Sequence, residues 1–211
     1  MSSESHETGG RSRRRLVLLT VSVLGVTGSL AGLGTYAAFT STGTVAQASF
    51  TSGVVTVSIP GAGATNRLTL GASDIVPGDT MQRVVDVENT GNTVLGAITL
   101  TTTASPSSLL DTDPTNGLQM AIDECSQSWT ESGVAPAYTY TCGGTTSNVL
   151  ASQAVIGSDL ALSNMTSTTP GDSDHLRVTL TFPSGTGNAL QGQASAITYA
   201  FTGTQRVGTA Q

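Results

Sequence analysis

The amino-acid sequence predicts an all-β protein, with one antiparallel β-sandwich domain preceded by an N-terminal signal helix. Only 10% of the 211 residues are charged, Lys is absent and 25 residues are Gly, so the residues that build helical domains are scarce. Beyond residue 50, apolar and polar residues repeatedly alternate between turn sequences, which is the pattern of half-buried strands. Hydrophobic residues make up 37% of the chain, enough for the thin core of a two-layer fold.

The first 37 residues have the anatomy of an export signal. Four Arg residues between positions 11 and 15 precede an uncharged apolar stretch at 16–37 that ends in small residues, as in a signal peptide. The same stretch is long enough to cross a bilayer as a retained anchor. We therefore expect a signal peptide at 1–37 or, as the alternative, a membrane anchor at 16–37, followed by a single domain at 38–211. The membrane is then contacted only through the signal segment, and the export route, Sec or twin-arginine, stays open.

Five segments of the domain alternate clearly and are predicted as strands: 54–59, 81–88, 97–101, 175–182 and 196–201. Turn sequences rich in Gly, Pro, Asn and Asp separate them: Pro77-Gly78-Asp79, Asn89-Thr90-Gly91-Asn92, Pro170-Gly171-Asp172 and Pro183-Ser184-Gly185. The part at 104–165 is less regular. Its apolar runs at 118–122 and 149–156 fit either strands or short helices.

The charge balance argues against one class of partner, and the cysteines predict a covalent cross-link. Without the first 37 residues, four Arg remain against twelve Asp and Glu, a net charge near −8 that makes nucleic acid a poor partner. Cys125 and Cys142 both lie in the exported part. In an oxidising compartment such a pair favours a disulfide, which would contribute about 3 kcal/mol in the chain-entropy model. Two unpaired thiols are the alternative.

Three blocks of the chain resemble the TasA/camelysin family of exported proteins. The first is Gly34-Thr35-Tyr36-Ala37-Ala38-Phe39 followed by Phe50-Thr51-Ser52-Gly53, which is similar to that family's signal junction. The other two are Val76-Pro77-Gly78-Asp79 leading to 85–92, and 188–192 leading to 201–205. The resemblance implies cleavage between Ala37 and Ala38 by a signal peptidase of the SipW type, and a jelly-roll-like sandwich.

The best-known members of that family build extracellular fibres of the biofilm matrix, in which the N-terminal segment of one subunit completes the sheet of the next. Here the segment from Phe39 to Phe50 is uncharged, lacks Pro and is rich in Thr, Ser and Ala, so it can add a strand to an exposed sheet edge. It could equally be a flexible tether or the protein's own first strand. The absence of Lys and the expected disulfide depart from the fibre-forming members and indicate a GC-rich, actinobacterium-like source.

Camelysin-type relatives are described as metallopeptidases, but this sequence shows no catalytic motif. It has no His-Glu-x-x-His pair, and His175 is the single His after residue 37, whereas a zincin needs two imidazoles and a carboxylate base. We expect no enzyme and no cofactor. Two weak metal candidates remain: Asp111, Asp113 and Asn116, in a loop of the calcium-binding type, and Asp172, Asp174 and His175. Solvated turns are the alternative for both.

The aromatic residues Trp129, Tyr138 and Tyr140 lie close to the cysteines. They could form a face that binds a sugar or a partner, or they could pack beside the disulfide. The sequence therefore favours a secreted, non-enzymatic structural protein of the cell surface or matrix, forming a homo-oligomer or fibre by N-terminal strand donation. The alternatives are a camelysin-like exported metallopeptidase and a signal-anchored surface binding protein.

Overall fold

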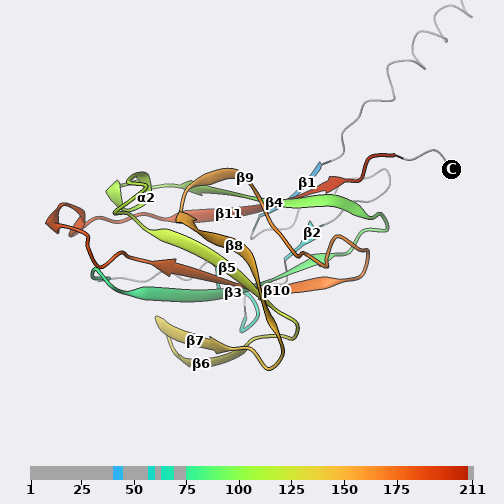
Figure 1. Ribbon diagram of the computed structural model, residues 1–211, viewed down its shortest axis with the longest axis horizontal. Helices are drawn as coiled ribbons and strands as arrows, with labels where there is room; N and C mark the ends of the chain where they lie inside the picture. The colour runs from blue at the N-terminus through green and yellow to red at the C-terminus, as the bar shows by residue number, and fades with distance from the viewer. Residues whose placement is uncertain (1–39, 45–56, 60–62, 69–74, 209–211) are drawn as a thin grey trace, which may run out of the picture. The chain divides into compact units, whose positions relative to one another are not determined.

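Alternating strands of this chain form two packed antiparallel sheets (Figure 1). The computed structural model describes residues 40–44, 57–59, 63–68 and 75–208, which belong to the unit Phe39–Gln211. The expected signal helix, the Ala37/Ala38 cleavage site and most of 39–50 lie outside the described residues. Within the described ranges, no helix combines the length and apolarity needed to span a bilayer.

The strands are β1 (Thr40–Thr44), β2 (Val57–Ser58), β3 (Thr80–Asn89), β4 (Leu95–Ala104), β5 (Gln119–Cys125), β6 (Thr130–Val134), β7 (Ala137–Thr141), β8 (Thr146–Ala154), β9 (Gly157–Ala161), β10 (Ser173–Thr181) and β11 (Ile197–Gln205). Two short helices accompany them, α2 (Leu109–Thr112) and the 3₁₀ turn η1 (Asn188–Leu190).

One sheet has the strand order β1-β11-β4-β9 and the other β2-β3-β10-β5-β8, while β6 and β7 form a separate hairpin. Every pairing is antiparallel. Consecutive strands lie in different sheets at β1/β2, β3/β4, β4/β5, β8/β9, β9/β10 and β10/β11, as in the connectivity of a jelly roll. The predicted all-β, jelly-roll-like sandwich is confirmed.

The core lies between the inner faces of the two sheets. Along β10 every second side chain is buried, as the two-residue period of a strand requires. Leu176 and Val178 from this strand share one cluster with Leu100 of β4 and Phe201 of β11. Burying each such side chain fully is worth about 1.5–3 kcal/mol, so the apolar alternation seen in the sequence is what holds the two layers together.

The irregular middle of the sequence contains mostly strands. Its two apolar runs are strands, β5 and β8, and three further strands, β6, β7 and β9, also lie there. The sequence pattern does not predict β6 or β9 as strands. Most of their side chains face solvent, so their sequences show no apolar alternation.

Several sheet edges are protected against pairing with another strand. The guanidinium of Arg83 donates to the Gln82 carbonyl on the β3 edge at 2.6 Å. On the β8 edge, Ser163 N donates to Val149 O at 3.0 Å, and Asn164 Nδ2 donates to Asn148 O at 2.9 Å. Strand β9 carries a charged residue, Asp159, in the left-handed region at φ 51. Strand β1 is the outermost strand of its sheet and has no charge in its five residues.

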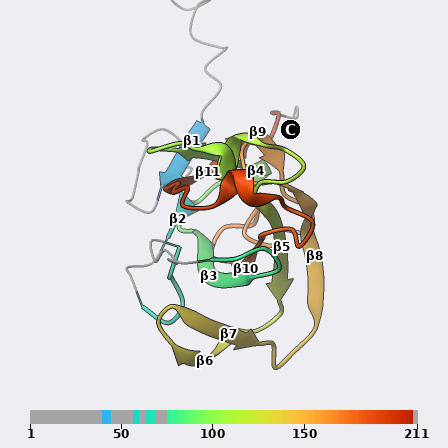
Figure 2. The ribbon, with the colours of Figure 1, turned by 90° about the vertical axis from the view of Figure 1, so that its left-hand side faces the viewer.

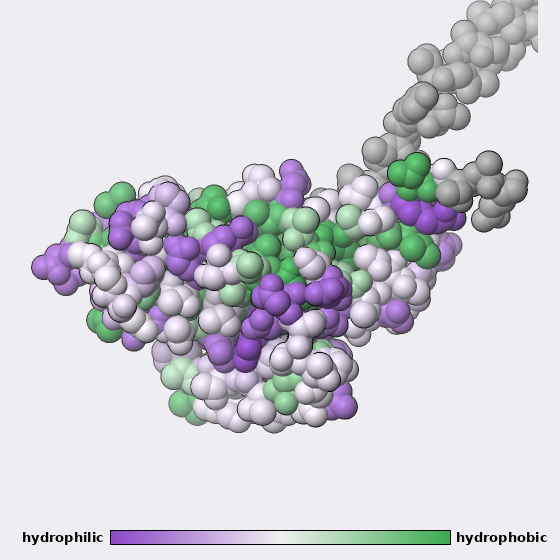
Figure 3. Space-filling model, in the orientation of Figure 1, coloured by the Kyte–Doolittle hydropathy of each residue, from purple (hydrophilic) through white to green (hydrophobic). Residues whose placement is uncertain are grey.

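Figure 3 shows an apolar band on the face where β8 and β9 lie in Figure 1. The partly buried side chains of Leu150 on β8, Leu160 on β9 and Leu162 just after β9 pack against the core. Ile156, between the two strands, is 37% exposed. The edge protection described above therefore lies beside exposed apolar surface, where unwanted pairing would otherwise be most favourable.

The core position of Phe201 gives a first prediction. Replacing it with Ala should destabilise the domain by about 3–5 kcal/mol, because a fully buried aromatic ring is lost and a cavity remains. Urea unfolding followed by Trp129 fluorescence measures the change. The matched control is Thr198→Ala on the same strand, where the exposed side chain should cost no more than about 0.5 kcal/mol. Equal effects of the two substitutions would contradict the assigned strand faces.

Candidate functional site

The N-terminal strand β1 is bound to the edge of β11. The register runs through five residue pairs, from Thr40 opposite Thr204 to Thr44 opposite Ala200. The strand lies inside the predicted donor segment Phe39–Phe50, whose remaining residues lie outside the described ranges. In this structure the strand pairs within its own chain, as the protein's own first strand. The pairing uses main-chain groups, so it would be the same with the β11 of another copy.

Gly203 of β11 lies where β1, β2 and β4 come together. A Cβ built on this residue would lie 2.9 Å from Val57 Cγ2 and 2.9 Å from Leu95 Cδ1, closer than real side chains approach. Glycine therefore allows Val57 of β2 and Leu95 of β4 to close over β11. In the main-chain pairing of β1 with β11, Ser41 lies opposite Gly203.

The disulfide predicted from the two cysteines is present. Cys125, at the end of β5, is bonded to Cys142, which follows β7, with 5.7 Å between their Cα atoms. Cys125 is fully buried and Cys142 is partly exposed. The bond closes the chain around the β6–β7 hairpin, which Figures 1 and 2 both place beside β3 and β10.

The aromatic residues near the cysteines attach this hairpin to the outer face of the five-stranded sheet. Trp129 and Tyr140 are buried in a small cluster with Val84 and Cys125. Trp129 Nε1 donates to the His175 carbonyl at 2.8 Å. These contacts are those of core packing beside a disulfide, one of the two interpretations drawn from the sequence.

Arg177 of β10 closes one side of this cluster. Its guanidinium carbon lies 4.4 Å from the centre of the Trp129 ring, within the range of a cation–π contact. Its Nη2 donates to Asp123 Oδ2 on β5 at 2.9 Å. The side chain therefore joins the aromatic ring that anchors the hairpin to the sheet beneath it.

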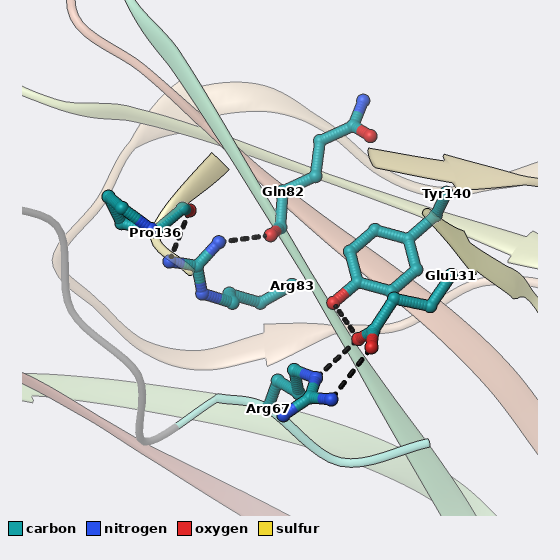
Figure 4. Close-up of polar contacts among 6 residues, drawn as sticks. All are labelled: Arg67, Gln82, Arg83, Glu131, Pro136 and Tyr140. Carbon is teal, nitrogen blue, oxygen red and sulfur yellow. Dashed lines mark hydrogen bonds and ion pairs between the residues drawn. The ribbon is translucent and has the colours of Figure 1, made fainter. Parts of the chain in front are cut away.

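A group of three hydrogen-bonded side chains holds the hairpin on its other side (Figure 4). Both nitrogens Nε and Nη2 of Arg67 donate to the Glu131 carboxylate, the Nη2–Oε1 distance being 2.7 Å. The Tyr140 hydroxyl donates to the same carboxylate at 2.9 Å. Hydrogen bonds from Arg67 hold the pKa of Glu131 below its ordinary value. We call this group of three residues the hairpin clamp.

Arg83 meets the hairpin near its turn. Its Nη2 donates to the Pro136 carbonyl at 3.2 Å, and its guanidinium carbon lies 5.6 Å from the Tyr138 ring centre, on which Arg67 also packs at 4.5 Å. Burial lowers the pKa of Arg83 from its ordinary value. A buried guanidinium with carbonyl partners thus supports the hairpin from the β3 edge.

The carboxylates of the first weak metal candidate accept hydrogen bonds from neighbouring residues. Asp111 completes a capping box at the start of α2 and accepts hydrogen bonds from Ser107, Ser108 and Ser195. Burial by itself would raise its pKa, but these hydrogen bonds outweigh that effect and lower it. Asp113 accepts from Thr115 N, Asn116 N and Asn116 Nδ2, and those bonds lower its pKa. Calcium binding by this loop stays a prediction.

The residues of the second candidate do not converge. Asp172 is exposed, whereas Asp174 and His175 are consecutive on β10 and therefore face opposite sides of the sheet. His175 Nδ1 lies 2.7 Å from Asp86 Oδ1 on the outer face. Asp174 is fully buried and accepts hydrogen bonds from the backbone N–H and the hydroxyl of both Thr166 and Ser167.

Asp174 has a carboxyl neighbour that the sequence did not single out, Glu124 of β5. Glu124 lies opposite Leu176, so Asp174 is its diagonal neighbour on the inner face. Burial raises the pKa of Glu124, the hydrogen bond from Ser147 opposes this rise, and the Asp174 carboxylate adds to it.

Among the residues that the structure describes, no three side chains of His, Cys, Asp or Glu lie close enough together to hold a metal ion. The donor set of the described part therefore does not fit a catalytic zinc, which needs three protein ligands.

The family model of the camelysin metallo-endopeptidases matches residues 14–127, more than half of the chain. The chain belongs to this family. The match ends before the β6–β7 hairpin, so Cys142 and most of the clamp lie beyond it. No curated protein matches the chain significantly.

The lowered pKa of Glu131 predicts that the clamp weakens in acid. A carboxyl group whose folded-state pKa is depressed stabilises the fold above its ordinary pKa of 4.5, and this stabilisation is lost as the pH falls through the folded-state value. Trp129 fluorescence recorded between pH 6 and about 2 should show a transition at the hairpin. Glu131→Gln should remove it; an unchanged transition in that variant would rule out Glu131 as its origin.

The buried carboxylate of Asp174 predicts a large effect of an isosteric substitution. Asp174→Asn should destabilise the domain by about 2–4 kcal/mol, because an amide nitrogen would face N–H and O–H donors. The exposed neighbour provides the control, Asp172→Asn, which should change the unfolding free energy by less than about 0.5 kcal/mol. Chemical denaturation measures both, and a tolerated Asp174→Asn would show that its four donors contribute little.

Proposed function

We propose that this camelysin-family chain is a secreted, non-enzymatic structural protein of the cell surface or matrix, whose copies assemble by exchanging the strand β1. After export and removal of residues 1–37 by a SipW-type peptidase, β1 lies next to the new N-terminus. The strand then leaves its own β11 and pairs with the β11 of a neighbouring copy. Repetition of this step produces a homo-oligomer or a fibre.

The pairing of β1 with β11 carries the proposal. It is made by main-chain groups along a charge-free strand at the end of a sheet. Exchange of an identical element forms the same contacts between copies as within one copy, so its cost in contact energy is small. Positions 45–56, between β1 and β2 in the sequence, contain no charged residue and no Pro.

The protection of the other edges supports assembly through β1. Arg83 covers a carbonyl of β3, Ser163 and Asn164 occupy carbonyls of β8, and Asp159 places a charge on β9. Such devices suppress pairing at the edges that carry them. A net charge near −8 on the domain also discourages contact between copies elsewhere.

The non-enzymatic character is supported by the use of the candidate side chains. Asp111, Asp113 and Asp174 each accept several hydrogen bonds from neighbouring residues, and His175 contacts Asp86. The family description favours the alternative, an exported metallo-endopeptidase. Incubation of the purified protein with a denatured protein substrate and Zn²⁺ separates the two. We expect no cleavage above the chelator-treated control, whereas chelator-sensitive cleavage would establish the peptidase.

Cysteine pairs placed by the register test strand exchange directly. Thr42 of β1 lies opposite Thr202 of β11, and opposite residues of antiparallel strands are close enough for a disulfide. Equal amounts of the single variants Thr42→Cys and Thr202→Cys are mixed and oxidised. Exchange predicts a covalent dimer joining one copy of each variant, identified by intact mass and peptide mapping.

Two controls make this result decisive. The double variant Thr42→Cys/Thr202→Cys, oxidised as a dilute monomer, should lock β1 onto its own chain and abolish assembly. A pairing-mismatched mixture, Thr42→Cys with Thr198→Cys, should give much less cross-linked dimer because Thr198 lies four residues along β11 from Thr202, the partner of Thr42. Assembly that continues in the locked variant would refute exchange of β1.

A further inference from the structure

Two carboxyl groups of the five-stranded sheet are neighbours on its inner face. Asp174 lies near the start of β10 and Glu124 near the end of β5. These two strands are paired, and the register places Glu124 opposite Leu176. Asp174 is two residues from Leu176, so it is the diagonal neighbour of Glu124 on the same face. Two negative charges this close, and partly shielded from water, oppose each other's ionisation.

The hydrogen bonds of Asp174 select its ionised form. The side chain is fully buried. Its Oδ1 accepts from the backbone N–H and the hydroxyl of Thr166, both at 2.7 Å. Its Oδ2 accepts from the backbone N–H of Ser167 at 2.9 Å and from the Ser167 hydroxyl. An ionised carboxylate offers about four acceptor sites and no donor, so a proton on Asp174 would point at groups that are themselves donors.

Glu124 has less support for its charge. Its side chain is partly buried and accepts one hydrogen bond from the Ser147 hydroxyl, at 3.0 Å. Burial raises the pKa of Glu124, the bond from Ser147 opposes this rise, and the charge and contact of the Asp174 carboxyl add to it. His175 acts in the other direction and lowers the pKa. Of the two carboxyls, the one with fewer donors is therefore the one that keeps a proton.

The elements around Glu124 bring few other charges to it. Strands β4 and β8 contain no charged or titratable residue, and positions 162–172 contain one, Asp172. Asp174 is thus the charged group with the largest influence on Glu124 among the described residues. The remaining groups of the adjoining elements are His175 with Asp86 and Asp123 with Arg177 on the outer face, Arg83 and Tyr199 further along the inner face, and the exposed Asp159 and Asp172.

We propose that Asp174 and Glu124 form a carboxylate–carboxylic acid pair in the folded domain, in which Glu124 holds the proton, and that loss of this proton as the pH rises makes the fold less stable. The pair is then a pH-sensitive device at the end of the core where β5, β8 and β10 meet. The inference concerns a single copy and stands whether or not β1 is exchanged between copies.

The sign of the effect follows from proton linkage. Glu124 has its ordinary pKa of 4.5 in the unfolded chain and a raised pKa in the folded one, so the folded state binds the proton more tightly. The stabilisation is fully present below 4.5 and is lost as the pH rises through the folded-state value. Glu131 of the hairpin clamp has a lowered pKa and acts in the opposite sense. The two groups therefore limit stability at opposite ends of the pH range.

An NMR titration of the side-chain carboxyl carbons shows which residue holds the proton. In the purified protein the Glu124 carboxyl should titrate with a midpoint above 4.5, while Asp174 stays ionised over the same range. Ser147→Ala should move the Glu124 midpoint further up, because the one hydrogen bond that favours the ionised form is lost.

The variant Glu124→Gln tests the effect on stability, because its amide has the shape of the protonated acid and cannot ionise. Urea unfolding is followed by Trp129 fluorescence at about pH 4 and about pH 8. The unfolding midpoint of the variant relative to the unmodified protein should be higher at about pH 8 than at about pH 4, by at least about 0.3 M urea. The matched control on the same strand is Asp123→Asn, which takes a carboxylate from Arg177 and should raise the midpoint at neither pH.

Three results would overturn the inference. Glu124 could titrate at or below 4.5, or Asp174 could take up the proton in its place. The relative midpoint of Glu124→Gln could also fail to rise with pH, which would mean that ionisation of Glu124 costs the folded domain nothing.

Discussion

The packing of β11 against the five-stranded sheet is the interaction on which the rest of the structure depends. Its inner face contributes Tyr199 and Phe201 to the core, both less than 5% exposed. Its two edges carry β1 and β4, and Gly203 admits Val57 and Leu95 at close range. Strand β11 therefore contacts the N-terminal strand β1, the core and β4. If β1 leaves, β11 loses the pairing at one edge and keeps its core packing and its pairing with β4.

The positively charged side chains of the domain are concentrated in one region. Of the four Arg residues after position 37, Arg67, Arg83 and Arg177 all contact the hairpin or the aromatic cluster beneath it. The acidic residues are far more numerous, so most of the surface carries no positive charge to attract an acidic neighbour. These Arg residues stabilise the β6–β7 hairpin, whereas the Thr-rich sheet edges pair through main-chain groups.

The sequence predicted the features that depend on local pattern. Apolar alternation identified β3, β4, β10 and β11, and two cysteines in an exported domain identified the disulfide. It could not identify the clamp, because Arg67 and Glu131 are far apart in sequence and each resembles an ordinary solvated charge. The same holds for Glu124, whose carboxyl meets Asp174 only because two strands are paired in one register. Such contacts are set by topology, which no short motif encodes.

The metal candidates show that the spacing of residues in sequence fits more than one local structure. Asp111, Asp113 and Asn116 resemble an ion-binding loop because oxygen-bearing side chains are closely spaced, yet the same spacing serves a helix cap and a tight turn. Asp174 and His175 are adjacent in sequence, and strand geometry directs them to opposite faces of the sheet.

An electron cryo-microscopy map of the assembled, secreted protein tests the central claim most directly, since the path of the chain between β1 and β2 can be followed in it. The account predicts that β1 of each copy lies on β11 of the next, antiparallel, with Thr42 opposite Thr202. Copies that each keep β1 on their own β11 and touch through another surface would contradict it.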